Sequence, residues 1–151
     1  MSSFQSFEKP WAIHANCVEV FGKAVLLLGK EGSQKSSLSY ALLQRGHVFI
    51  ADDLVMIKEN KGLLWGSNVQ DKYLLDLKEK GIVDIQKIFK KEQIKRKALL
   101  FGGFVLEKNW GKHFFYEDLL QKKIILYPLD SKLMDDRILF IEKVCSEARH
   151  A

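Results

Sequence analysis

The chain has 151 residues, 47% of them hydrophobic, and its 24 lysine and arginine residues outnumber 19 aspartate and glutamate residues to give a formal net charge of +5. This length and apolar content predict one domain over residues 1–151, and the positive charge suits phosphate-bearing ligands or an acidic partner. Two cysteines exclude a disulfide scaffold. No apolar run approaches the roughly 20 residues of a membrane span, so we expect a cytoplasmic protein that binds no membrane.

The hydrophobic pattern predicts more strands than helices. Strands are expected at 13–20, 23–28, 47–51, 54–58, 63–66, 98–106 and 137–142. Helices are expected at 35–45, 84–91 and 116–122. The stretch from Ile57 to Trp65 predicts a hairpin that turns at residues 59–62. The predicted fold class is α/β, with a mixed β-sheet around the helix at 35–45.

One stretch, LLLGKEGSQKSSLSYALLQRGHVFIADD at residues 26–53, predicts a nucleotide-binding unit. A buried strand ends at Gly29, and the helix at 35–45 is followed by Gly46, where a left-handed C-cap residue is expected. A second strand then ends in an aspartate pair. Strand, glycine loop, helix, strand and acidic pair follow one another as in a nucleotide-binding βαβ unit.

The loop itself, GKEGSQKS, is a variant of the Walker A sequence G-x-x-x-x-G-K-[ST]. Gly29, Lys35 and Ser36 stand at the required positions, and Gly32 adds a second flexible point. Gln34 occupies the position where the consensus has glycine, and a side chain there restricts the backbone. On the loop alone, a glycine turn before a helix is the favoured interpretation.

The context of the loop resembles HPr kinase/phosphorylase, the bacterial serine kinase of the phosphocarrier HPr, in its short single-domain form. His14, the P-loop, RGH at 45–47 and ADD at 51–53 occur in the family's order. LDLKEKGIV at 75–83 is similar to a further family stretch, and the resemblance covers about residues 13–143. It implies the P-loop kinase fold shared with phosphoenolpyruvate carboxykinase, without the separate N-terminal domain and the C-terminal helix of longer members.

The resemblance also implies site residues and cofactors, namely ATP and Mg²⁺. Asp53 would take the proton of the acceptor serine, His14 would hold Asp53, and Lys35 would neutralise the γ-phosphoryl group. Ser36 and Asp76 would ligate the metal. The nucleotide-binding residues would be Gly29, Lys30, Glu31, Gly32, Ser33, Gln34, Lys35 and Ser36.

The implied function is ATP-dependent phosphorylation of a serine on an HPr-type phosphocarrier, with a phosphate-dependent reverse reaction, in the regulation of carbon and nitrogen metabolism. Two features favour an alternative, a degenerate nucleotide-binding or non-catalytic module that binds a partner protein. These are Gln34 and the absence of the family's arginine after Trp110. A small-molecule kinase on the same scaffold stays open, as does the formation of a homo-oligomer. The basic residues are mixed with acidic ones, which is typical of a solvated surface, so no nucleic-acid partner is expected.

Overall fold

The computed structural model describes residues 9–30, 34–78, 80–107 and 115–147. Its strands are β1 (Trp11–Ile13), β2 (Asn16–Val20), β3 (Lys23–Leu28), β4 (Val48–Ala51), β5 (Val55–Asn60), β6 (Leu63–Asn68), β7 (Leu74–Leu77), β8 (Gly81–Asp84), β9 (Lys97–Val105) and β10 (Ile125–Pro128). Its helices are α1 (Lys35–Gln44), α2 (Ile85–Ile88), the 3₁₀ helix η2 (Lys91–Gln93), α3 (Phe115–Lys123) and α4 (Met134–Glu147). Among the described residues, no helix has the length and hydropathy needed to cross a membrane.

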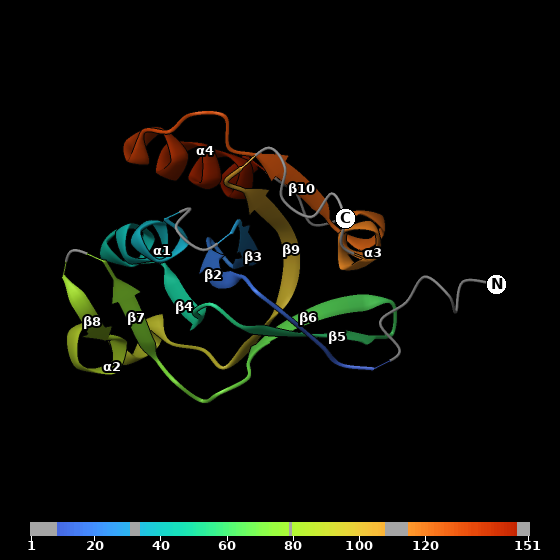
Figure 1. Cartoon of the computed structure of the whole chain (residues 1–151), viewed down its shortest axis with the longest axis horizontal. Helices are drawn as coiled ribbons and strands as arrows, with labels where there is room; N and C mark the ends of the chain where they lie inside the picture. Colours follow the sequence, from blue (N-terminus) through green and yellow to red (C-terminus); the bar gives the residue numbers. More distant parts are fainter. Residues whose placement is uncertain (1–8, 31–33, 79, 108–114, 148–151) are drawn as a thin grey trace.

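A mixed sheet with the strand order β1-β5-β6-β9-β3-β2-β4 forms the frame of the molecule, and β10 pairs with β9. The pairings of β9 with β3 and with β10 are parallel, and the remaining pairings in this sheet are antiparallel. Strand β9 is curved, and it joins the strands β1, β5 and β6 on one side of it to the strands β3, β2 and β4 on the other (Figure 1). Strands β7 and β8 form a separate two-stranded sheet.

Helices α1 and α4 lie side by side over β2, β3 and β9 (Figure 1). The apolar side chains between these helices and the sheet form one core cluster, which includes Val18, Leu27, Leu38, Phe104 and Ile141. The opposite face of the same strands packs against β5, β6 and α3 in a second cluster. Strand β3 is covered on both faces, so all six of its residues are buried, and the five after Lys23 are apolar.

The strongest element predictions are confirmed. Helix α1 and strands β3 and β4 begin and end within one residue of their predicted positions. The helix predicted at 116–122 is present as α3. The hairpin of β5 and β6 turns at Lys61 and Gly62, which have φ angles of 54° and 81°. A two-residue turn with positive φ at both central residues matches the twist of two antiparallel strands.

The strand predicted at 137–142 is wrong, because this segment belongs to helix α4. The run RILFI is rich in residues that favour strands, yet Ile138, Ile141 and Cys145 are buried at helical spacing. The helix predicted at 84–91 is much shorter, since α2 is capped by the Asp84 side chain and ends at Ile88. The predicted strand 13–20 is interrupted between β1 and β2, and strands β7, β8 and β10 were not predicted.

Candidate functional site

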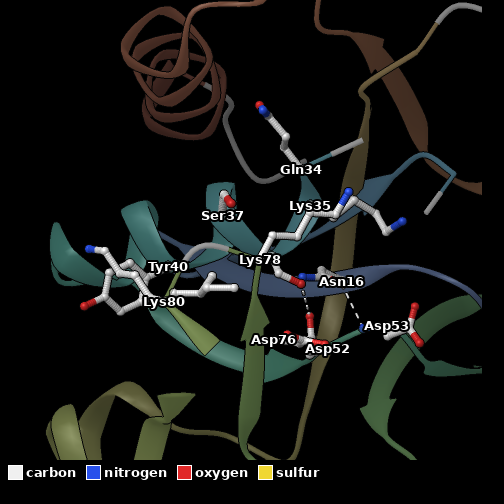
Figure 2. A pocket seen from close by; sticks show the side chains of 12 residues that line it. Asn16, Gln34, Lys35, Ser37, Tyr40, Asp52, Asp53, Asp76, Lys78 and Lys80 are labelled. Atoms are coloured by element: carbon white, nitrogen blue, oxygen red, sulfur yellow. Dashed lines mark hydrogen bonds between the residues drawn. The ribbon is translucent and has the colours of Figure 1, made fainter. Parts of the chain in front are cut away.

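A cavity of about 410 Å³ lies at the N-terminal end of α1. Its walls come from four places in the chain: the first turn of α1, the start of β2, the turn after β4, and the strand β7 with the residues after it. Figure 2 shows side chains of both charges turned toward this space, with aspartates on one side and lysines on the other. A helix N-terminus presents unpaired N–H groups and a partial positive charge, so this position favours an anion.

Lys35 is the first residue of α1 and is largely buried. Its ammonium group donates hydrogen bonds to the carbonyl oxygens of Gly29, at 2.6 Å, and of Lys30, at 3.2 Å. The lysine therefore lies across the loop that precedes its own helix. Of the residues predicted to bind the nucleotide, Glu31, Gly32 and Ser33 lie outside the described residues. Gln34, Lys35 and Ser36 line the cavity at the helix N-terminus, whereas Gly29 and Lys30 directly follow β3 and are not part of its lining.

Gln34 is the N-cap residue of α1 and has a left-handed backbone, with φ 74° and ψ 26°. Glycine adopts this conformation without the steric cost that a Cβ atom brings, which explains the glycine of the Walker A consensus. The glutamine keeps the same backbone shape at a cost of about 1 kcal/mol. Its side chain is exposed and points away from Asp52 and Asp53 in Figure 2. The substitution leaves the space beside the aspartates open.

Asp52 lines the cavity but was not among the site residues predicted from the sequence. The Ser36 hydroxyl donates a 2.7 Å hydrogen bond to its carboxylate. Burial raises the pKa of Asp52, and hydrogen bonds from Ser36 and Asn16 and from the Asp76 backbone oppose this rise. The sequence analysis noted the aspartate pair, but the resemblance assigned a role to Asp53 alone.

Both aspartates reach the cavity because the backbone changes direction between them. Asp53 has a φ of 67°, a left-handed conformation that aspartate tolerates better than most residues. Its carboxylate lies 3.9 Å from Nδ1 of His14, and the two side chains are 75% and 78% exposed. The predicted convergence of His14, Lys35 and Asp53 is therefore present in part. Lys35 and Asp53 line the cavity, whereas His14 stands beside Asp53 just outside its lining.

The oxygen donors at the floor of the cavity suit a hard divalent cation. Ser36 and Asp52 are in contact, and Asp76, on β7, lines the same cavity. Within the described ranges, no three His, Cys, Asp or Glu side chains are arranged to hold a metal on their own. Mg²⁺ at a nucleotide site takes only one or two protein carboxylates and completes its shell with phosphates and water. The donor set present here fits that coordination.

The family model described as HPr Serine kinase C-terminal domain matches residues 5–134. The chain belongs to the HPr serine kinase C-terminal domain family. It is 34% identical over 127 residues to an HPr kinase/phosphorylase of Chlorobaculum tepidum, a match that covers 80% of this chain and 36% of that protein. An HPr kinase/phosphorylase of Malacoplasma penetrans is 28% identical over 135 residues, covering 82% and 44%. The chain thus spans less than half the length of these two relatives.

A solved structure, the HPr(Ser) kinase/phosphatase from Coxiella burnetii, has the same fold. The superposition gives a TM-score of 0.72 at 25% sequence identity and covers 90% of this chain and 88% of that chain. The predicted family and the predicted fold class, a mixed α/β P-loop kinase domain, are both confirmed.

The RGH segment that contributed to the resemblance to the HPr serine kinase family lies outside the cavity and connects two helices. Arg45 donates two 2.7 Å hydrogen bonds to the Glu142 carboxylate, and Nε2 of His47 lies 2.6 Å from the same group. Hydrogen bonding by Arg45, and then by His47, lowers the pKa of Glu142. These contacts fasten the end of α1 to α4, so they hold the helix whose N-terminus forms the cavity.

Proposed function

We propose that this protein transfers the γ-phosphoryl group of Mg-ATP to a serine of an HPr-type phosphocarrier. One observation carries the proposal: a buried lysine, a serine–aspartate pair and a second, exposed aspartate meet in one cavity at the N-terminus of α1. Membership of the HPr serine kinase family supports the same reaction. The proposal includes ATP as the phosphoryl donor, the carrier as the acceptor, and a role in the regulation of carbon and nitrogen metabolism.

The nucleotide phosphates would occupy the helix N-terminus. Backbone N–H groups of the loop from Gly29 to Ser36 would donate to the phosphate oxygens. Lys35 would exchange its bonds to the carbonyls of Gly29 and Lys30 for bonds to the phosphates, because the oxygens of a phosphate are stronger, charged acceptors. Little covalent chemistry is required of the protein in phosphoryl transfer, so positioning and charge neutralisation dominate.

Ser36, Asp52 and Asp76 would hold the magnesium ion of the nucleotide. Bound there, Mg²⁺ supplies neutralisation of the charge on the β- and γ-phosphate oxygens. Asp52 is our addition to the two ligands expected from the sequence. It is included because it accepts the Ser36 hydrogen bond and is more buried than Asp76.

Asp53 would act as the base. Its carboxylate would accept the proton of the acceptor hydroxyl while the new Oγ–P bond forms and the bond from the γ-phosphorus to the β,γ-bridging oxygen breaks. In the reverse direction it would return that proton to the serine as an oxygen of inorganic phosphate attacks the phosphoserine. His14, 3.9 Å away, would hold the carboxylate in place. The exposure of Asp53 suits a substrate that is itself a folded protein.

The test mixes purified protein, Mg-ATP and HPr-type carriers and detects carrier phosphoserine by mass spectrometry. A carrier with alanine in place of the acceptor serine and a reaction with EDTA serve as controls. Phosphoserine that requires both the serine and the metal is the expected result. ATP binding without any phosphoserine would instead identify a non-catalytic nucleotide-binding module, the alternative that the strained Gln34 favours.

A further inference from the structure

We propose that Asn16 is a positioning residue that couples the first turn of α1 to the aspartate pair. This inference rests on the proposed function, because it concerns how the lysine and the base are held relative to each other. Asn16 is the first residue of β2 and is fully buried, and it lines the cavity between α1 and the turn after β4 (Figure 2).

Four groups form a continuous chain of hydrogen bonds from the lysine to the base. The Ser39 hydroxyl donates to the backbone carbonyl of Lys35 at 3.0 Å. The Asn16 amide nitrogen donates to that hydroxyl at 2.8 Å, and the Asn16 amide oxygen accepts the backbone N–H of Asp53 at 2.8 Å. Hydrogen bonding by Asn16 also opposes the rise of the Asp52 pKa that burial causes.

An asparagine fits this place because its side chain donates and accepts at the same time. The Asp53 N–H can only donate, so the amide oxygen must face it, and the amide nitrogen then faces Ser39 and Asp52. Burying an amide without hydrogen-bond partners is unfavourable, and here both ends of the amide have partners. The other residues of β2 that are buried, Cys17, Val18 and Val20, are apolar, which sets Asn16 apart as the one polar side chain buried in this strand.

The consequence concerns the strained backbone at Asp53. A left-handed conformation persists where surrounding contacts determine it, and the Asn16 oxygen fixes the N–H of that residue. Asp52 directly precedes Asp53, so the contact that fixes the Asp53 backbone also restricts the position of Asp52, and one amide places both aspartates near the helix that carries Lys35. Losing this link would displace the carboxylates while leaving the phosphate-binding loop intact.

The experiment compares Asn16→Ala, Asn16→Asp and Ser39→Ala with Val20→Ala, a buried truncation in the same strand that touches none of these groups. Carrier phosphorylation is measured well below the thermal midpoint of each variant. We expect Asn16→Ala to lower kcat about ten- to a hundredfold with KM for ATP within about twofold. Val20→Ala should leave both constants within about twofold. Asn16→Asp keeps the acceptor for Asp53 but replaces the donor with a buried carboxylate beside Asp52, so it should lower kcat at least as much as Asn16→Ala. Ser39→Ala breaks only the link to Lys35, so its kcat should fall between these limits.

A second readout separates this inference from the proposed function. Amide hydrogen exchange at Asp53, followed by NMR, should be at least about tenfold faster in Asn16→Ala than in the wild type, and unchanged in Asn16→Asp and Val20→Ala. If the wild-type protein phosphorylates no carrier, the proposed function fails, and the exchange rates alone decide whether Asn16 holds the turn. Unchanged exchange at Asp53 in Asn16→Ala would overturn the inference, as would a kcat loss no larger than that of Val20→Ala.

Discussion

The hydroxyl of Ser36 and the carboxylate of Asp52 lie 2.7 Å apart, joined by a hydrogen bond between the first turn of α1 and the end of β4. The carboxylate is partly buried, and the hydrogen bonds that oppose its raised pKa come from neutral groups. Burial of an ionised carboxylate that has only neutral hydrogen-bond donors is unfavourable, and a nearby cation would offset this desolvation penalty. The geometry of this pair is thus complementary to a bound divalent ion.

Asp52→Asn should stabilise the nucleotide-free protein and abolish transfer. The pKa of Asp52 is raised in the folded state, so its contribution to stability is present below the unfolded pKa and is lost as the pH rises through the folded pKa. At pH 7 the ionised carboxylate is therefore a net cost, which asparagine removes. Thermal unfolding should show a higher midpoint for the variant. Mg-ADP should raise the wild-type midpoint more than that of the variant, and equal shifts would contradict the assignment.

Asp53→Asn should lower phosphoryl transfer at least about a hundredfold and leave ATP affinity within about twofold. Asparagine adopts the left-handed backbone as readily as aspartate, so the shape of the turn is kept while the base is lost. Single-turnover kinetics and calorimetry measure the two effects separately. Asp130→Asn, an exposed substitution outside the lining of the cavity, is the matched control. Full transfer activity in Asp53→Asn would show that another residue is the general base.

Lys35→Met should weaken ATP binding about ten- to a hundredfold, because a charge-assisted contact contributes about 1.5–3 kcal/mol. Methionine keeps the apolar stem of this buried side chain and removes only the ammonium group. Calorimetry with Mg-ATP gives the affinities, and Lys58→Met, an exposed substitution on β5, controls for the loss of one positive charge. Equal affinities for both variants would exclude nucleotide binding at this loop.

Gln34→Gly should stabilise the protein by about 1 kcal/mol and raise the thermal midpoint by roughly 2–4 °C, because glycine adopts the left-handed conformation without a steric cost. ATP affinity should be kept or improved. Gln34→Ala removes the same side chain but retains the strain, so its midpoint should stay near that of the wild type. If ATP binds only to the Gln34→Gly variant, the natural protein has lost nucleotide binding and is not an active kinase.

Glu142→Gln should destabilise the fold by about 2 kcal/mol at pH 7, because it removes the charged acceptor shared by Arg45 and His47. The pKa of Glu142 is lowered from 4.5, so its contribution is present above the unfolded pKa and is lost as the pH falls through the folded pKa. Urea unfolding between pH 7 and pH 3 should therefore show a smaller acid-induced loss of stability in the variant. Glu147→Gln, exposed on the same helix, should behave as the wild type.

The strand–loop–helix–strand unit was predictable because local signals agree there. An apolar run, a glycine after the helix and an acidic pair all indicate the same structure, and tertiary contacts did not override them. Helix α4 was not predictable from composition, since Ile138 and Ile141 fit a strand as well as a helix until packing selects the period. Asn16 and Asp52 were missed for another reason. A single asparagine at the start of a strand has no distinguishing spacing, and the partners that define the roles of Asn16 and Asp52 lie 23 and 16 residues away in the sequence.

The exposure of Asp53 has a consequence for where water is excluded. A carboxylate that is 75% accessible sits at an open surface, where a solvent molecule reaches it as readily as a serine hydroxyl does. Phosphoryl transfer that avoids hydrolysis needs dry surroundings, and for the described part of the chain these are absent on the side of Asp53. If the protein phosphorylates a carrier as we propose, the acceptor protein would supply them. The substrate would then close the reaction chamber with its own surface, and the complete active centre would exist only while the two proteins are docked.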